Sequence, residues 1–366
     1  MFDYYLISTP LHMFVASALA LHRGNRCIAI FIDQYEGQSD CFVDSLRDRS
    51  SGSPFEHVFV FGGRNVSLLQ KKSFRKELFK ELGEIVSVYA PGSIFCGNDR
   101  RIEFQFLMHF SQRGYPQVEG VYLDEGLFSY VGREASNSYS DRFVDTFFKK
   151  LAYGNWWSHP PTVGAGKWIS TAYLAYPELA HPLIQLKKMK KIEPEWFYDS
   201  SFVKLTQSWL ACFDVERKVI ENSRVVLTLP QDRNMRLVPG YVDRVYDLVD
   251  SLSSAGYGIS VKYHPSEQQR DPLQVSSRSS VSILPAKIPF EVLLPFMPRE
   301  NAFVIGDMSS TLIMTRLFRP DVGVLAIQPD QENKHFKQFD LLYRKMDIPV
   351  LPMKRIIDSV MDGVEE

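Results

Sequence analysis

Two adjacent carboxylates, Asp124 and Glu125, stand before Gly126 at the end of an apolar segment. That segment, Glu119–Asp124 (EGVYLD), has the length and apolar content of a buried strand. One of two acids in a tight turn after a strand can project forward and deprotonate a hydroxyl group as a general base. The alternative is an ordinary solvated turn, because Asp, Glu and Gly are all common in turns.

A histidine follows a second apolar segment, Gly258–Tyr263. Pro265 favours an extended backbone at the residue before it, so we expect the His264 ring to project from the strand end. From there the ring could donate a hydrogen bond to a phosphate oxygen, and Lys262 could add positive charge. The alternative is a surface histidine in a loop.

Hydroxyl groups gather where a third apolar segment, Asn301–Gly306, leads into a helix predicted to begin near Ser309. The free backbone amides and the dipole of a helix start form an anion site. The side chains of Ser309, Ser310 and Thr311 would add hydroxyl donors. Ordinary helix capping is the alternative, and it is compatible with anion binding.

Glu291 lies in the first turn of a predicted short helix, Phe290–Pro295, where it could accept hydrogen bonds from ribose hydroxyls. Compensation of the helix dipole is the alternative reading. The sequence lacks G-x-G-x-x-G, a Walker A loop and H-E-x-x-H. Because the eight histidines also form no local cluster with metal-ligand spacing, we expect a site without a metal.

These segments belong to two successive runs of alternating strands and helices. The first run begins with a strand at Asp3–Ser8, and the second begins at Arg224–Leu229. This rhythm predicts an α/β protein with parallel sheets, and we expect two Rossmann-like domains facing each other across a cleft. The stretch 129–198 is less regular and is predicted to form helices and loops of the first domain.

We place the N-terminal domain at 1–215 and the C-terminal domain at 216–345, with a linker near 200–222. The last segment, 346–366, is expected to pack back on the N-terminal domain. Ligands of such sheets bind beyond the carboxyl ends of the strands, which is where the residues described above stand.

Composition narrows the class of protein. The chain has 366 residues and a net charge of −1, which disfavours a nucleic-acid binder. No apolar stretch reaches about 18 residues and no basic region precedes the first one, so we expect a cytoplasmic protein. Basic runs at 70–80 and 186–191 are compatible with peripheral association with the inner membrane. The simpler interpretation of both runs is a solvated helix face. The sequence leaves a homodimer open.

Four short motifs, taken together and in order, resemble the bacterial sialyltransferases of glycosyltransferase families 38, 52 and 80. The opening segment YLISTPLHMFVASALAL resembles the start of family 52, the lipooligosaccharide sialyltransferases. The His-Pro and Ser-Ser segments equally resemble family 38, the capsule polysialyltransferases. The motifs are LDEG (123–126), KYHPSE (262–267), IPFEVL (288–293) and DMSSTL (307–312).

The resemblance implies a GT-B fold and an inverting, metal-independent sialyltransferase. The enzyme would need no cofactor and would move sialic acid from CMP-sialic acid to a hydroxyl of a bacterial surface glycan, lipooligosaccharide or capsule. Its C-terminal domain would bind the CMP-sugar and its N-terminal domain the acceptor. A CMP-Kdo transferase and a catalytically silent GT-B protein that binds glycan or nucleotide are the alternatives.

The resemblance also assigns roles to residues. Asp124 would be the general base, with Glu125 as its neighbour or substitute, and Asp232 in LTLPQDRN would be a rival base. His264 would stabilise the leaving phosphate, and Glu291 would bind the ribose. The remaining CMP-binding residues would be Lys262, Pro265, Ser309, Ser310 and Thr311, and the acceptor pocket would include Thr9, Pro10 and Gly126.

Overall fold

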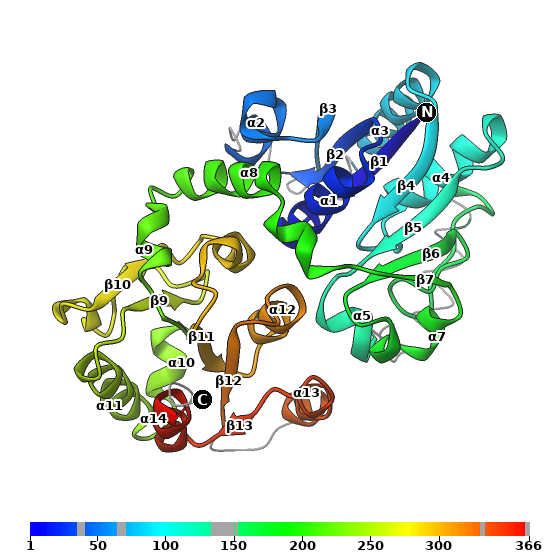
Figure 1. Ribbon diagram of the computed structural model, residues 1–366. Helices are drawn as coiled ribbons and strands as arrows, with labels where there is room; N and C mark the ends of the chain where they lie inside the picture. The colour runs from blue at the N-terminus through cyan, green and yellow to red at the C-terminus, as the bar shows by residue number, and fades with distance from the viewer. Residues whose placement is uncertain (35–40, 64–70, 133–149, 151–152, 330–333, 363–366) are drawn as a thin grey trace. The chain divides into compact units, whose positions relative to one another are not determined.

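The computed structural model describes the chain except residues 35–40, 64–70, 133–149, 151–152, 330–333 and 363–366. It forms two compact units, Met1–Leu205 and Thr206–Glu366, and the division falls inside helix α8 (Ser200–Ala211). Each unit is built on one parallel sheet with helices packed around it (Figure 1). The prediction of two α/β units with parallel sheets is confirmed.

The sheet of the first unit has seven parallel strands in the order β3-β2-β1-β4-β5-β6-β7. Every residue of β1 is buried, as expected for a central strand covered on both faces. Tyr4 and Leu6 join the core shared with α3 and α4, whereas Tyr5 stacks on Phe95 of β4. The strands are β1 (Phe2–Ile7), β2 (Cys27–Gln34), β3 (Phe55–Gly62), β4 (Pro91–Cys96), β5 (Glu119–Leu123), β6 (Ile169–Leu174) and β7 (Lys188–Lys191).

Helix α1 (Pro10–Arg23) begins directly after β1 because its start is well specified. The Thr9 hydroxyl accepts a hydrogen bond from the His12 amide at 3.2 Å, and Pro10 occupies the first helical position. Gly24 ends the helix in the left-handed conformation. These signals fix the first turn of α1 at the carboxyl end of β1.

The stretch 129–198 was predicted to lack strands, and this is wrong because it contains β6 and β7. Strand β7, with the sequence KMKK, is an edge strand, where lysine discourages further strand pairing and hides the apolar signal. The helices of the first unit are α1, α2 (Cys41–Arg47), η1 (Arg49–Ser51), α3 (Lys71–Val88), α4 (Ile102–Gly114), α5 (Leu127–Val131), η2 (Pro177–Leu179), α7 (Pro182–Gln185) and η3 (Pro194–Tyr198).

The sheet of the second unit has six parallel strands in the order β10-β9-β8-β11-β12-β13. This is the 3-2-1-4-5-6 order of a Rossmann fold, and the first six strands of the other sheet follow the same order. The strands are β8 (Val225–Leu229), β9 (Ile259–Tyr263), β10 (Val281–Leu284), β11 (Phe303–Asp307), β12 (Gly323–Ile327) and β13 (Val350–Leu351).

The C-terminal helix α14 (Met353–Asp362) packs on α11 (Tyr241–Ser254) within the second unit. Its apolar residues Met353, Ile356 and Val360 are buried in that unit's core. The expectation that 346–366 packs on the N-terminal domain is corrected accordingly. The other helices are α9 (Arg217–Glu221), α10 (Asp232–Arg236), η4 (Val275–Ser277), η5 (Phe290–Phe296), α12 (Ser310–Phe318) and α13 (Lys334–Lys345).

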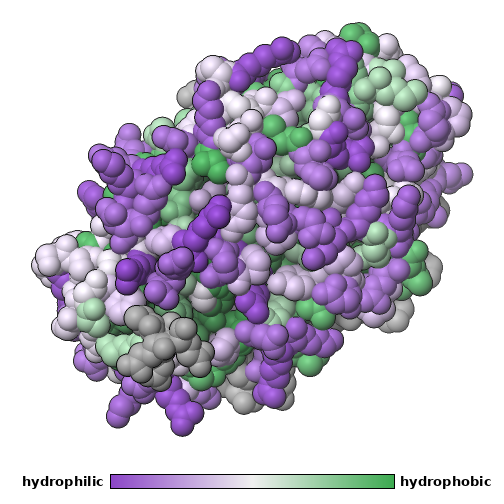
Figure 2. All heavy atoms as spheres, in the orientation of Figure 1, coloured by the Kyte–Doolittle hydropathy of each residue, from purple (hydrophilic) through white to green (hydrophobic). Residues whose placement is uncertain are grey.

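Polar and charged residues cover most of the face drawn in Figure 2, and hydrophobic residues show there in small patches. No helix in the described part of the chain combines the length and apolar character that crossing a bilayer requires.

Candidate functional site

The predicted site residues fall into two sets, one in each unit. Both sheets reverse their strand order at a switch point, between β1 and β4 in the first unit and between β8 and β11 in the second. Ligands of such sheets bind at the carboxyl ends of the strands near this point. The first set follows β1 and β5. The second set lies at the end of β9 and after β8, β10 and β11.

Asp124 is buried and its carboxylate is fully engaged. Oδ1 accepts a hydrogen bond from the amide of Gly126 at 2.8 Å. Oδ2 accepts from the amide of Ala175 at 3.1 Å and from the hydroxyl of Tyr130. Burial raises the pKa of Asp124, and these hydrogen bonds oppose the rise. The carboxylate therefore ties the turn after β5 to the end of β6, and its lone pairs already have donors.

The turn after Asp124 depends on Gly126, whose φ of +77° lies in the region that favours glycine. Gly126 precedes helix α5 and is buried. It therefore shapes the turn that carries the two acids, while Thr9 and Pro10 lie exposed at the start of α1.

Glu125 differs from its neighbour because its side chain is 14% exposed and is directed toward the edge of α1. Its Oε1 lies 3.9 Å from Nε2 of His12, which is 1% exposed. His12 Nδ1 is 3.0 Å from the Ser8 hydroxyl. Burial and the nearby Arg101 lower the pKa of His12 to about 4, so the ring is neutral near pH 7. Glu125 thus shares the carboxyl edge of the sheet with a neutral histidine.

His264 is exposed at the end of β9, as predicted, and its ring is held by Ser266. The Ser266 amide lies 3.2 Å from Nδ1, and the Ser266 hydroxyl lies 2.6 Å from the same atom. A backbone amide can only donate, so Nδ1 accepts and the neutral ring carries its hydrogen on Nε2. Nε2–H is therefore a preorganised donor, and exposed Pro265 follows it in the chain.

Lys262 and Glu291, which were predicted to contact the phosphate and the ribose, interact electrostatically with each other. Lys262 is 5% exposed and its Nζ donates to the Ala286 carbonyl at 3.1 Å. Burial lowers the pKa of Lys262 to about 8, against the opposing charge of Glu291. Burial also raises the pKa of Glu291, and Lys262 opposes that rise. The lysine is thus anchored to the segment after β10, and the charge of Glu291 favours its protonated form.

The start of α12 carries a buried hydroxyl that lacks a hydrogen-bond partner among the described residues. Ser309 is the N-cap residue, but no side chain in the described part of the chain caps this helix. The Ser309 hydroxyl is buried and, within the described residues, has no hydrogen-bond partner. Ser310 is exposed and Thr311 is half-buried in the first turn. This is the pattern expected of a helix start that receives an anion.

Two tyrosines that the sequence did not single out hold the loop before α12. The Tyr343 hydroxyl accepts from the Ser309 amide and donates to the Ser309 carbonyl, both at 2.8 Å. The Tyr241 hydroxyl donates to Asp307 Oδ1 at 2.7 Å. Both lie on helices remote in sequence from the loop, so no local pattern could have indicated them.

Asp232, the rival base, begins helix α10 after β8 and is half-buried. Its Oδ2 accepts from Arg236 Nε at 2.8 Å, and its amide donates to Glu267 at 2.9 Å. The carboxylate is therefore neutralised by a neighbour on its own helix.

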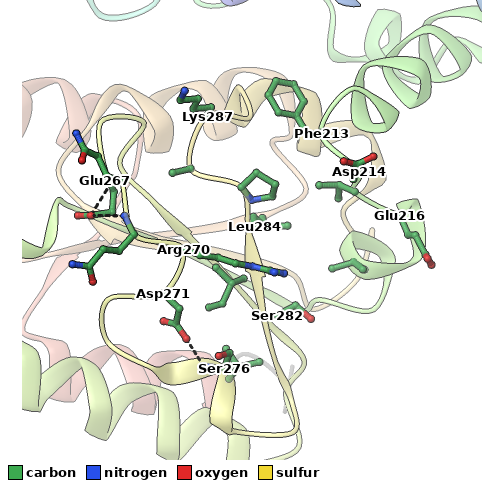
Figure 3. Close-up of a pocket in the computed structure, with 18 residues that line it drawn as sticks. Phe213, Asp214, Glu216, Glu267, Arg270, Asp271, Ser276, Ser282, Leu284 and Lys287 are labelled. Carbon is green, nitrogen blue, oxygen red and sulfur yellow. Dashed lines mark hydrogen bonds between the residues drawn. The ribbon is translucent and has the colours of Figure 1, made fainter.

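A cavity of about 1060 Å³ lies along the edge strand β10 of the second sheet (Figure 3). It is lined by the segments before α9, after β9 and around β10, and includes Glu267 and Lys287. Arg270 extends toward β10 in this view, and Asp271 accepts from the Ser276 amide at 2.9 Å. His264, Ser309 and Ser310 do not line this cavity, which is separate from the predicted phosphate site.

The described residues contain no group of three or more His, Cys, Asp or Glu side chains placed to hold a metal ion. The basic run 186–191 is partly neutralised. Lys187 donates to the Gly166 carbonyl, Lys190 to the Tyr173 hydroxyl, and Lys191 pairs with Glu193 at 3.2 Å. Of the run 70–80, Gln70 lies outside the described residues, and Lys80 is 3.7 Å from Glu84.

Solved structures similar to this chain share its two-sheet architecture, which is that of GT-B glycosyltransferases and related epimerases. A UDP-GlcNAc 2-epimerase from Methanocaldococcus jannaschii has a TM-score of 0.52 and 10% identity, covering 100% of this chain and 92% of that chain. A UGT transferase from Siraitia grosvenorii in complex with UDP has a TM-score of 0.51 and 9% identity, with the same coverage. An Arabidopsis thaliana UGT enzyme complexed with UDP-L-rhamnose has a TM-score of 0.51 and 12% identity, covering 99% and 89%. At these identities the likeness shows the fold alone.

Sequence comparison identifies a family. No curated protein sequence matches the chain. The family model described as Alpha-2,8-polysialyltransferase (POLYST) matches residues 64–328, which is more than half of the chain and includes both sets of site residues from β5 onward. The chain therefore belongs to the alpha-2,8-polysialyltransferase family and is a glycosyltransferase of the sialyltransferase type, with a nucleotide-sugar donor and a glycan acceptor.

Proposed function

We propose that this protein transfers sialic acid from CMP-sialic acid to a hydroxyl of a bacterial surface glycan, with inversion and without a metal ion. The observation that carries this proposal is the start of α12, where the Ser309 hydroxyl is buried and lacks a hydrogen-bond partner within the described residues. An anion such as the CMP phosphate would complete the hydrogen bonding of this helix start.

The second unit would stabilise the leaving group. Departure of CMP leaves negative charge on its phosphate, and donors fixed in advance lower the barrier most when they face that charge. The candidates are the amides at the start of α12, the Ser309 hydroxyl and Nε2–H of His264. Ser310 and Thr311 would add hydroxyl contacts, and Glu291 would accept from the ribose. Lys262 would act indirectly, because its ammonium is committed to the segment after β10.

The first unit would supply the base, and we assign this role to Glu125 instead of Asp124. The carboxylate of Asp124 already accepts hydrogen bonds from Tyr130, Ala175 and Gly126. If it took the proton of the glycan hydroxyl, it would lose these bonds and the turn would be disrupted. Glu125 is the more exposed of the two acids. Asp232 remains the rival, although its pairing with Arg236 favours an unreactive carboxylate.

The family description favours an acceptor that itself ends in sialic acid, as in a capsule polysaccharide. Thr9, Pro10 and Gly126 would border the acceptor pocket at the carboxyl edge of the first sheet. Membrane association and a homodimer stay predictions. Family membership disfavours the catalytically silent alternative, and the choice between CMP-sialic acid and CMP-Kdo is settled by offering both donors.

The experiment is a transfer assay with the purified protein in EDTA, using CMP-sialic acid or CMP-Kdo and acceptors with or without terminal sialic acid. We expect CMP release and glycan extension with CMP-sialic acid only. His264→Ala should lose roughly 10²-fold or more in kcat, as expected when a preorganised donor is removed. The exposed Gln268→Ala serves as a matched surface control. Transfer that needs a metal, or that is indifferent to His264→Ala, would contradict the proposal.

A further inference from the structure

His12 is a buried histidine at the carboxyl edge of the first sheet that the proposed reaction has not used. It is 1% exposed, and its Nε2 has no hydrogen-bond partner among the described residues. A buried polar nitrogen without a hydrogen-bond partner lowers the stability of the fold. Such a nitrogen beside a candidate base therefore indicates a functional role. The carboxylate oxygen Glu125 Oε1 lies 3.9 Å from this nitrogen.

The surroundings of the ring determine where its hydrogen lies. The Ser8 hydroxyl, 3.0 Å from Nδ1, can either donate or accept. If Nδ1 carried the hydrogen, the lone pair of Nε2 would face the carboxylate of Glu125. With Ser8 donating to Nδ1, Nε2 carries the hydrogen and directs it toward the negative charge. The second arrangement has the lower electrostatic energy.

The ring has little room to turn away from Glu125. A Cβ at position 97 would lie 2.1 Å from His12 Nε2, so the backbone of Gly97 closes against the ring. Gly97 directly follows β4, the strand next to β1 at the switch point. The imidazole therefore lies between Ser8, at Nδ1, and the end of β4, with Nε2 against Gly97 and 3.9 Å from Glu125 Oε1.

We propose that His12 is a positioning residue for glycosyl transfer, whose Nε2–H holds the Glu125 carboxylate ionised and oriented as the base. This inference rests on the assignment of Glu125 as the base in the proposed function. The present 3.9 Å is longer than a hydrogen bond, and a shift of the Glu125 side chain by about 1 Å closes it. Hydrogen bonds at catalytic groups commonly tighten when the substrate binds.

The charges near the pair are consistent with a neutral donor. Arg101 stands close enough to oppose protonation of His12, and burial acts in the same direction. Among the described residues, Cys96 and Tyr122 also interact electrostatically with Glu125, and both interact with Asp99. Because the ring stays neutral, it stabilises the carboxylate by a directed hydrogen bond without competing for its proton.

Two substitutions separate this role from a structural one. His12→Asn keeps a polar atom near Nδ1 for Ser8 but is too short to reach Glu125. His12→Gln can place an amide N–H near the Nε2 position. We expect His12→Asn to lower kcat by roughly 10-fold, the size of one hydrogen bond to a charged group, and to move the acid limb of the kcat/KM profile to higher pH. His12→Gln should restore most of the rate and the original limb, with the donor KM unchanged in both.

The outcomes distinguish the positioning role of His12 from the assignment of Glu125 as the base. If Glu125→Gln is inactive but His12→Asn and His12→Gln show the same rate and an unmoved acid limb, the role of His12 is overturned and the base stands. If Glu125→Gln keeps its activity, the base assignment falls and the inference falls with it. Thermal melting of each variant reports whether it folds. Should His12→Asn fail to fold, the kcat/KM profile of His12→Gln decides, because its acid limb must then coincide with that of the wild type.

Discussion

The carboxyl edges of the two sheets are built in opposite ways. In the first unit Asp124 is buried with both carboxylate oxygens engaged, and the adjacent Glu125 lies 3.9 Å from the buried His12 of α1. In the second unit His264 is exposed, and the Ser309 hydroxyl at the start of α12 has no partner among the described residues. The engaged carboxylate of Asp124 holds its own turn in place, whereas a helix start whose Ser309 hydroxyl has no partner among the described residues is ready for an anionic ligand. The same strand order thus supports two different kinds of site.

The largest expected effect concerns the two neighbouring acids. Glu125→Gln should lower kcat by roughly 10²–10⁴-fold, the usual loss when a general base is removed, with little change in melting temperature because the side chain is partly exposed. If Glu125→Gln remains active, Glu125 is not the general base and the contrast between the two neighbouring acids is wrong. Asp232→Asn is the matched test of the rival base, and a comparable loss there with an active Glu125→Gln would move the base to the second unit.

Asp124→Ala should act mainly on folding. It leaves the Tyr130 hydroxyl and the amides of Ala175 and Gly126 without their acceptor in a buried turn. Each bond to a charged group contributes about 1.5–3 kcal/mol, so we expect the free energy of unfolding to fall by at least about 3 kcal/mol. Denaturant unfolding measures this. Wild-type stability combined with lost activity would instead identify Asp124 as the catalytic base.

The Lys262 site in the second unit predicts a pH-dependent stability. The pKa of Lys262 is lowered from 10.5 to about 8, so the protonated lysine destabilises the folded state. Its favourable contribution is present above pH 10.5 and is lost as the pH falls through 8. Relative to Lys262→Met, the wild type should therefore lose up to about 3 kcal/mol of unfolding free energy between pH 10.5 and 8. If the unfolding free energies of the wild type and Lys262→Met changed equally with pH across this range, the buried environment of Lys262 would be refuted.

The smallest effect is expected at the start of α12. Ser309→Ala removes one donor to the anion, so we expect CMP to bind roughly 10-fold more weakly, with melting temperature unchanged because this hydroxyl bonds no described residue. Calorimetric titration with CMP measures the change. Thr315→Ala, on the same helix but bonded back to the Thr311 carbonyl, is the control and should leave CMP affinity unaltered. Equal affinity of Ser309→Ala and wild type would place the phosphate elsewhere.

Much of the fold could be predicted because buried parallel strands have short, continuous apolar sequences. The runs at β1, β5, β8, β9 and β11 all became strands within a few residues of their predicted limits. Strand β7 was missed because an edge strand is polar, and β6 because a strand of six residues stands alone after an irregular stretch. The packing of α14 was wrongly predicted because an amphipathic helix does not specify which core receives its apolar face.

The sequence by itself determined which chemical groups stand after which strands, since strand ends and helix starts are encoded by neighbouring residues. Only the tertiary structure decided what those groups do. Asp124 and Glu125 are adjacent in the chain, but contacts with Tyr130 and Ala175 engage one and leave the other beside His12. Tyr343 reaches Ser309 from a distant helix in the same manner. Hydrogen-bond saturation depends on partners brought together by folding, and for that reason no local pattern could reveal it.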